Sequence, residues 1–154
     1  MPDEKPDEKP EAMALLVADI FEAAGALRRV GESLAQAEGL TQARWQALSV
    51  ASEEPVTVPR AARRLGVSRQ NVQRVANDLV ALGKAEYTAN PDHRGSPLLT
   101  LTPAGRATLG RITARASALH RTVATDLPDE AIDEARSFIR RLVAELGAYE
   151  ARNR

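Results

Sequence analysis

The chain has 154 residues, of which 44% are hydrophobic and 27% charged, with 21 basic and 21 acidic side chains and no cysteine. This composition indicates one compact domain, or one domain with extensions. The absence of cysteine excludes disulfides, thiolate metal sites and cysteine nucleophiles, and no stretch approaches the about 18 consecutive apolar residues of a membrane span.

The first ten residues are acidic and rich in proline, with a near-repeat of Pro-Asp-Glu-Lys. Such a segment buries little apolar surface, so residues 1–10 are predicted to be a disordered tail rather than a signal sequence. We therefore expect a cytoplasmic protein with no membrane partner.

Residues 11–37 are predicted to form a long amphipathic helix. Its apolar residues recur at alternating spacings of four and three, the heptad pattern of a helix that packs along another helix. This seam consists of Leu16, Ile20, Ala23, Leu27, Val30 and Leu34. A shorter helix is predicted from the capping residue Thr41 to about Glu54, with Trp45 on its buried side.

The middle of the chain is predicted to contain two capped helices joined by a turn of about three residues. Thr57 and Ser68 are residue types that cap helices, and each precedes a run with apolar residues at helical spacing. Gly66 and Gly83 are suited to ending these helices. This arrangement is typical of a helix-turn-helix, which holds its second helix in a DNA groove.

The second helix of the pair has an apolar and a polar side. Its polar side and N-terminal tip carry Ser68, Arg69, Gln70, Gln73, Arg74 and Asn77. Gln and Asn side chains can bond an adenine edge and Arg a guanine edge, while the serine and the helix N-terminus suit phosphate oxygens. The alternative is an ordinary solvated face.

A β-hairpin is predicted after this helix. Ala85–Thr88 and Leu98–Leu101 are short runs with strand-forming residues, separated by a segment dense in turn formers. Arg94 on this narrow projection, or wing, suits the minor groove, where the negative potential is focused. Asp92 could hold the Arg94 guanidinium, and His93 suits a phosphate or groove contact. The alternative is a flexible loop with an incidental ion pair.

The net charge of the whole chain is zero, but the charge is unevenly distributed. From Thr57 to Arg94 there are seven basic and three acidic residues, a local excess of +4. A local basic patch on a neutral chain is the pattern expected for phosphate contacts.

Residues 103–150 are predicted to form two further long helices. Thr102 is an N-cap with Pro103 at the first helical position, and Pro128 and Asp129 open the last helix. The apolar stripes of the two helices consist of Leu109, Ile112, Ala116, Leu119 and Val123, and of Ile132, Ala135, Ile139, Leu142, Leu146 and Tyr149.

The run Leu65–Gly83, the D-x-R of Asp92 and Arg94, and the L-T-x-x-G-R of residues 101–106 together resemble the MarR family of bacterial transcriptional regulators. The resemblance covers nearly the whole chain. It implies a homodimer that binds a palindromic operator, usually as a repressor relieved by a small ligand. In the family, the residues at the major groove match Ser68, Gln70, Asn71 and Arg74, and the residue in the minor groove matches Arg94.

The expected fold is therefore mainly α with a small β-hairpin wing. A winged helix-turn-helix DNA-binding domain spans residues 40–102, and residues 11–37 and 103–150 form a helical dimerisation region. Two-fold pairing would place the recognition helices about 34 Å apart, one turn of DNA. The alternative is an intramolecular bundle. The residues expected at the dimer interface are Leu16, Ile20, Leu27, Ile132, Ile139, Leu142 and Leu146.

The expected function is sequence-specific binding of double-stranded DNA by a regulator of transcription. A small-molecule effector, phenolic or aromatic, follows from the resemblance alone. The alternative is a winged-helix protein-interaction module whose basic surface binds an acidic partner. His93 and His120 are far apart in sequence, and no P-loop, G-x-G-x-x-G or G-x-S-x-G motif occurs. We therefore expect no enzyme activity, metal site or cofactor.

Overall fold

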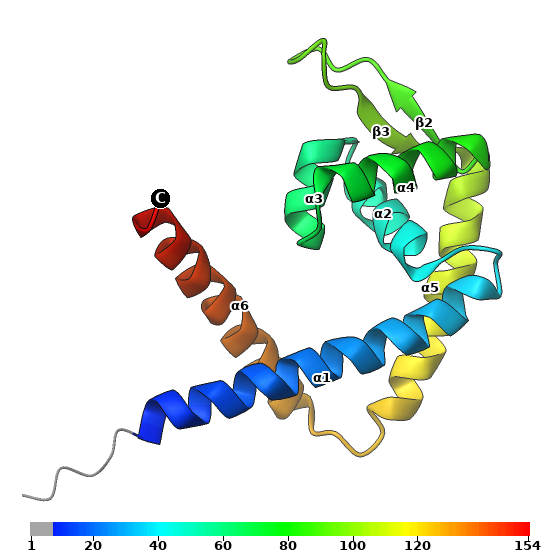
Figure 1. Ribbon diagram of the computed structural model, residues 1–154. Helices are drawn as coiled ribbons and strands as arrows, with labels where there is room; N and C mark the ends of the chain where they lie inside the picture. The colour runs from blue at the N-terminus through cyan, green and yellow to red at the C-terminus, as the bar shows by residue number, and fades with distance from the viewer. Residues whose placement is uncertain (1–7) are drawn as a thin grey trace, which may run out of the picture. The chain divides into compact units, whose positions relative to one another are not determined.

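The computed structural model describes residues 8–154, which form six helices and three strands (Figure 1). The chain divides into two compact units, one reaching to Ala116 and the other spanning Ser117–Arg154. The elements are α1 (Glu8–Gln36), α2 (Gln42–Glu53), β1 (Val56–Thr57), α3 (Val58–Leu65), α4 (Arg69–Ala81), β2 (Ala85–Thr88), β3 (Leu98–Leu101), α5 (Pro103–Val123) and α6 (Asp129–Arg152).

Helices α2, α3 and α4 begin at the predicted capping residues. The side chains of Thr41, Thr57 and Ser68 each accept a hydrogen bond from a backbone N–H in the first turn of α2, α3 and α4. Gly66, directly after α3, and Gly83, two residues after the last residue of α4, adopt the left-handed conformation with φ of 67° and 70°. The capped pair of helices is thus confirmed.

Helix α1 begins at Glu8, earlier than predicted. Glu8 and Glu11 lie in its first turn, where carboxylates interact favourably with the helix dipole. Pro10 is tolerated there because the first-turn N–H groups have no partner within the helix. Residues 8–10 of the predicted disordered tail are therefore helical, and the rest of that tail lies outside the described residues.

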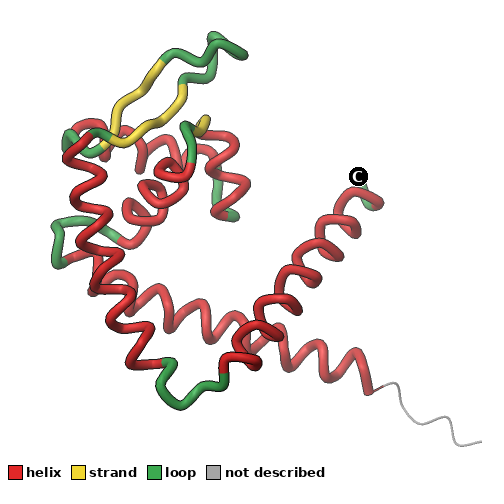
Figure 2. The backbone as a smooth tube through the Cα atoms, turned by 180° about the vertical axis from the view of Figure 1, so that it is seen from behind, coloured by secondary structure: helices red, strands yellow, loops and turns green. Residues whose placement is uncertain are grey.

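The wing, which we define as β2, β3 and residues 89–97 between them, belongs to a three-stranded antiparallel sheet of order β1-β3-β2. Figure 2 shows its loop continuing beyond the strands and away from the neighbouring helices. Strand β1 has only two residues, Val56 and Thr57, which pair with Leu99 and Leu98. It was not predicted, because two residues, the second of which caps α3, show no alternating pattern.

The hydrophobic core of the first unit lies between α2, α3, α4 and the sheet, and it includes Ala35 of α1 and Ile112 of α5. Its largest fully buried hydrophobic side chains are those of Leu48, Val56, Leu79, Leu99 and Ile112. Trp45 is partly buried and packs against this core, as predicted from its position in α2. The apolar side of α4 is buried in the same core, which leaves the polar side of α4 facing outward.

The end of α4 is joined to the start of α5 by a short set of backbone contacts. The Thr102 N–H donates to the Lys84 carbonyl oxygen at 3.1 Å, and the Thr102 hydroxyl donates to the Gly83 carbonyl oxygen at 2.6 Å. Gly105 is buried, and a Cβ atom at this position would overlap the Lys84 carbonyl oxygen. The Thr and Gly of the L-T-x-x-G-R motif therefore fix how α5 leaves the winged part.

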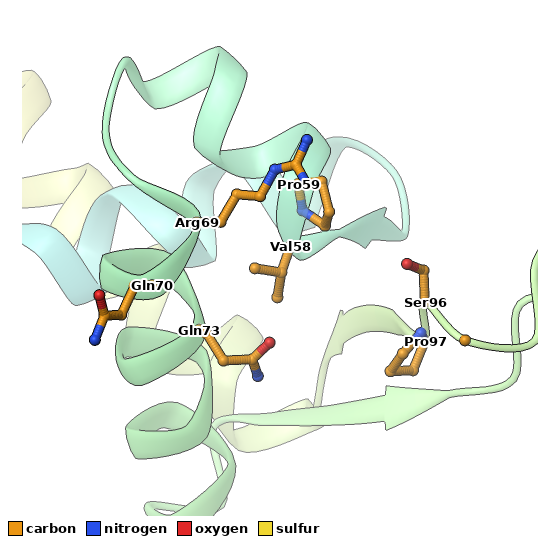
Figure 3. A pocket seen from close by; sticks show the side chains of 8 residues that line it. Val58, Pro59, Arg69, Gln70, Gln73, Ser96 and Pro97 are labelled. Carbon is orange, nitrogen blue, oxygen red and sulfur yellow. The ribbon is translucent and has the colours of Figure 1, made fainter.

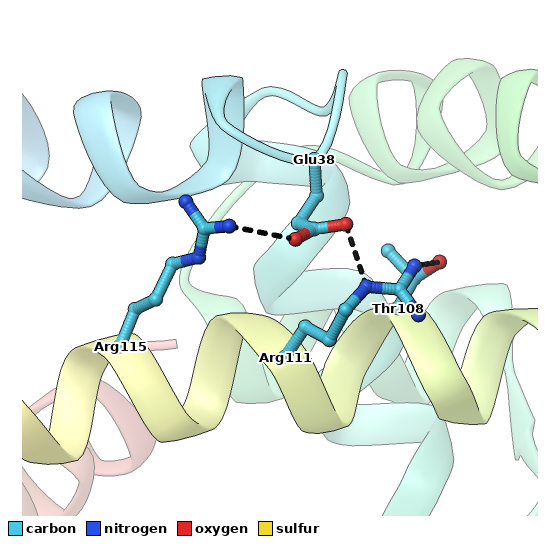
Figure 4. Close-up of polar contacts among 4 residues, drawn as sticks. All are labelled: Glu38, Thr108, Arg111 and Arg115. Carbon is cyan, nitrogen blue, oxygen red and sulfur yellow. Dashed lines mark hydrogen bonds and ion pairs between the residues drawn. The ribbon is translucent and has the colours of Figure 1, made fainter.

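A second joint within the first unit connects the turn after α1 to α5 (Figure 4). The Glu38 carboxylate accepts from Arg111 Nε at 2.8 Å and from an Arg115 guanidinium nitrogen at 3.2 Å. The Glu38 side chain is only 11% exposed. The hydrogen bond from Arg111 and the charges of both guanidinium groups lower the pKa of Glu38 below its ordinary value of 4.5.

The second unit contains the end of α5 and all of α6. Helix α6 begins at Asp129 after Pro128, as predicted, and none of its residues is buried. None of the helices formed by residues 8–154 is long and apolar enough to span a membrane.

Candidate nucleic-acid interface

The outer face of α4 carries the side chains that the sequence assigned to the major groove. Those of Ser68, Arg69, Gln70, Gln73, Arg74 and Asn77 are exposed. Asn71 is partly buried and lines a small cavity with Val67 and Val72. Asn71 is thus the least accessible of the seven.

Ser68 combines two functions at the tip of α4. Its hydroxyl oxygen accepts a hydrogen bond from the Asn71 N–H at 3.1 Å, which caps the helix. The hydroxyl proton remains available for a further acceptor, and the first N–H groups of a helix are suited to anions. Both features suit a DNA phosphate at this position.

The tip of the wing is organised by Asn90, a residue that the sequence identified only as a turn former. Its Nδ2 donates to the Ser96 carbonyl oxygen at 2.9 Å, and its Oδ1 accepts from the Asp92 N–H at 3.0 Å. Asp92, His93 and Arg94 are all exposed on the loop held in this way.

The expected contact between Asp92 and Arg94 is absent. Neither residue takes part in any of the ion pairs formed within residues 8–154. A pairing between two exposed side chains stabilises a loop by little, because water solvates both charges and the side chains lose freedom. Arg94 is therefore held by the loop backbone and not by a partner carboxylate.

A groove of about 260 Å³ separates α4 from the wing (Figure 3). Gln73 extends from α4 toward the wing, whereas Gln70 points away from the groove. The residues that line it are Val58, Pro59, Arg69, Gln70, Gln73, Gly95, Ser96 and Pro97. The groove is thus lined by polar side chains of α4 on one side and by mainly apolar residues of α3 and the wing on the other.

A hydrogen-bonded group that the sequence did not predict joins α4 to the wing. Gln73 Nε2 donates to Asn77 Oδ1 at 3.1 Å and to the Tyr87 hydroxyl at 2.9 Å. The Tyr87 hydroxyl in turn donates to Asn77 Oδ1 at 2.7 Å. Burial raises the pKa of Tyr87, and the hydrogen bond from Gln73 acts in the opposite direction. In the sequence, the one indication of this contact is a tyrosine in the strand that is predicted to follow the recognition helix.

The local positive charge is smaller than the sequence count suggested. Arg64 pairs with Glu53 at 2.7 Å, and Arg60 pairs with Glu54 at 2.5 Å. Both carboxylates precede Thr57, so they lie outside the segment with the excess of +4. They nevertheless balance two of the three arginine charges of α3. By contrast, Arg69, Arg74 and Arg94 have no ion-pair partner within residues 8–154. The unbalanced positive charge is therefore concentrated on α4 and the wing.

The position of α4 is also fixed on its other side. Arg44 of α2 pairs with Asp78 of α4 at 3.0 Å, and both side chains are partly exposed. Together with the packed apolar side of α4, this contact holds the recognition helix against α2. Among residues 8–154, no group of three or more His, Asp or Glu side chains could hold a metal ion.

A capped recognition helix with an exposed polar side, a small antiparallel sheet and a projecting wing define a winged helix-turn-helix protein. Comparison with known proteins extends this classification. Residues 38–94 match the MarR family. The chain is 55% identical over 138 residues to an uncharacterized protein of Mycobacterium bovis, Mb2034c, and the match covers 90% of this chain and 96% of that protein.

Solved structures share the fold of this chain. BldR of Sulfolobus solfataricus has a TM-score of 0.77 at 17% identity, over 92% of this chain and 99% of that chain. CouR of Rhodococcus jostii RHA1, solved bound to p-coumaroyl-CoA, has a TM-score of 0.74 at 19% identity, over 82% of this chain and 90% of that chain. The chain belongs to the MarR family of transcriptional regulators, which are DNA-binding proteins and not enzymes.

Proposed function

We propose that this chain is a homodimeric repressor that binds a palindromic operator in double-stranded DNA. In each protomer the outer face of α4 reads the major groove and Arg94 enters the neighbouring minor groove. The observation that carries the proposal is the exposed polar face of α4 beside a wing whose arginine has no ion-pair partner in residues 8–154. Because chromosomal DNA of a bacterium lies in the cytoplasm, we also propose a cytoplasmic location.

The exposed apolar residues of the long helices support the homodimer. Leu27 is 69% exposed, Ile139 48% and Leu146 54% in the single chain, although all three lie on predicted helix seams. Exposed apolar side chains in a row are typical of a surface that another chain covers. Pairing through these helices would supply the two recognition helices that a two-fold operator needs.

We infer that a small aromatic or phenolic effector lowers the affinity for DNA. The support is the CouR structure, which contains p-coumaroyl-CoA, an aromatic acyl thioester. An effector would act by favouring a spacing of the two winged parts that does not match the groove repeat. Trp45 is the one tryptophan, so its fluorescence offers a probe for titrations with such compounds.

Selection from a library of randomised duplexes tests the proposal most broadly. The parent protein should select a palindrome whose half-sites lie about one helical turn apart. A variant carrying Arg74→Ala and Arg94→Ala should lose most of its affinity for the selected duplex. A control variant, Arg28→Ala with Arg152→Ala, removes the same charge at exposed positions on α1 and α6 and should bind like the parent.

Two results would contradict the proposal. The parent could enrich no sequence, or the Arg74 and Arg94 variant could bind duplexes as well as the parent does. The first result would favour a winged-helix module that binds an acidic protein partner through this surface, and the second would show that DNA is contacted by other residues.

A further inference from the structure

The group formed by Gln73, Asn77 and Tyr87 connects two amide side chains of the recognition helix to strand β2. Gln73 and Asn77 lie one helical turn apart on the exposed face of α4. Tyr87 is partly buried, packs against the core and brings its hydroxyl to both amides. The three bonds, at 3.1, 2.9 and 2.7 Å, form a closed ring.

This ring uses a defined part of each amide. A side-chain amide nitrogen has two N–H donors, and both donors of Gln73 Nε2 are engaged, one with Asn77 Oδ1 and one with the Tyr87 hydroxyl. The Asn77 oxygen accepts two bonds and is likewise fully used. Gln73 Oε1 and Asn77 Nδ2 are the atoms that remain free for another partner.

The state of the Tyr87 hydroxyl makes the arrangement specific. The hydroxyl accepts from Gln73 and donates to Asn77, so it must keep its proton. A tyrosine hydroxyl keeps its proton at neutral pH, and burial raises the pKa of Tyr87 further above its ordinary value of 10.0. A phenylalanine at this position would keep the aromatic side chain packed in place and remove only these two hydrogen bonds.

We propose that Tyr87 is a positioning residue that restricts Gln73 to accepting, and Asn77 to donating, hydrogen bonds at the major groove. Gln73 then selects a base with an exocyclic amino group, adenine or cytosine, without distinguishing strongly between the two. This inference rests on the proposed function, because it assigns a base preference to a helix that reads DNA.

The restriction has a chemical consequence for the bases that Gln73 can read. A free glutamine bonds adenine in bidentate fashion, accepting from N6 and donating to N7. With both Nε2 donors engaged, Gln73 can only accept, and the N6 amino group of adenine and the N4 amino group of cytosine both satisfy it. Guanine and thymine present acceptors at the corresponding major-groove positions and leave Gln73 Oε1 without a partner.

Sequencing of duplexes selected by the parent and by variants tests the inference. The base pair that Gln73 contacts is the one at which Gln73→Ala loses its preference. At that position the parent should accept adenine and cytosine to a similar extent. Tyr87→Phe frees one Nε2 donor and should favour adenine over cytosine by about tenfold, because the bidentate contact becomes possible.

Three comparisons make the test decisive. Ser137→Ala is the matched control, because it also removes a hydroxyl, at an exposed position on the side of α6 opposite to the apolar stripe, and it should select like the parent. The double variant Gln73→Ala with Tyr87→Phe should show the preference of Gln73→Ala alone, since Tyr87 acts through Gln73 at this position. Urea unfolding should show that Tyr87→Phe remains folded.

The inference is overturned if Tyr87→Phe selects the same bases as the parent, or if Gln73→Ala changes no position. In both cases a parent that still selects a palindrome leaves the proposed function intact. A parent that enriches no sequence defeats the proposed function itself, and the inference falls with it.

Discussion

Gly105 lies where the backbone of α5 packs closely against the end of the α4 segment. Its missing side chain leaves room for the Lys84 carbonyl oxygen, which also accepts from the Thr102 N–H at 3.1 Å. Gly110 lies in the same helix, and a Cβ there would meet nothing within 4 Å. Close packing therefore requires a glycine at position 105 but not at position 110 of the same helix.

We expect Gly105→Ala to lower the free energy of unfolding by about 3 kcal/mol or more, because backbone must move to admit the methyl group. Gly110→Ala should raise it by about 0.5–1 kcal/mol, since glycine is a poor residue for a helix interior. Urea denaturation of both variants checks the pair. Equal stability of Gly105→Ala and the parent would show that the junction between α4 and α5 is not tightly packed.

Arg94 is expected to contribute affinity rather than sequence preference. Arg94→Ala should weaken binding of every duplex by about 1.5–3 kcal/mol, as for loss of a hydrogen bond to a charged group. It should also lower the slope of log affinity against log salt by about 1. Fluorescence anisotropy across a salt series measures both quantities. If the variant loses affinity for one sequence only, Arg94 contacts base edges and not the phosphates beside the minor groove.

At the scale of secondary structure, α5 is fixed to the turn after α1 by Glu38. The pKa of Glu38 is lowered in the folded chain by Arg111 first, and also by Arg115. A carboxylate with a lowered folded pKa stabilises the fold at pH values above its unfolded pKa, and this contribution disappears as the pH falls through the folded pKa.

We therefore expect Glu38→Gln to be less stable than the parent at neutral pH, with a difference that narrows below the ordinary carboxyl pKa of 4.5. Thermal unfolding measured between neutral and acidic pH checks this prediction. Glu145→Gln is the control, because Glu145 is exposed on α6 and has no ion-pair partner among residues 8–154. A pH-independent difference for Glu38→Gln would show that its contacts with Arg111 and Arg115 do not depend on charge.

The elements that local signals control could be predicted from the sequence. Thr57 and Ser68 cap α3 and α4 as expected, and the bounds of β2 and β3 agree with the predicted runs. Such signals act between residues that are close in the chain, so they can be recognised in the amino-acid sequence alone. The outer face of α4 followed from the same helical periodicity, because burial of Val72 and Leu79 leaves the opposite side exposed.

The contacts between distant segments could not be predicted in this way. Strand β1 exists only because Val56 pairs with Leu99, which lies far along the chain. The bond from Gln73 to Tyr87 depends on how α4 crosses the sheet. Glu53 pairs with Arg64 and so balances part of the positive charge that was predicted to contact DNA phosphates. Each of these features requires the tertiary fold and has no local pattern.

For the whole molecule, the proposed dimer depends on the apolar stripe of α6. Leu146 is 54% exposed on that stripe, whereas Ser137 is exposed on the opposite side of the same helix. Leu146→Glu should dissociate the dimer, because pairing would bury an unpaired carboxylate. Ser137→Glu adds the same charge on the polar side and should leave the dimer intact. Sedimentation velocity at micromolar concentration checks both, and a monomeric parent would rule out the proposed dimer.

The central claim is that the outer face of α4 and the tip of the wing contact duplex DNA. The chain contains no cysteine, so single cysteines can be introduced at Gln70, Arg94 and Ser137. Disulfide cross-linking of each variant to a selected duplex that carries thiol-tethered bases is the most direct measurement. We expect cross-links from Gln70→Cys in the major groove and from Arg94→Cys in the minor groove, and none from Ser137→Cys. Cross-linking from Ser137→Cys alone would contradict the account.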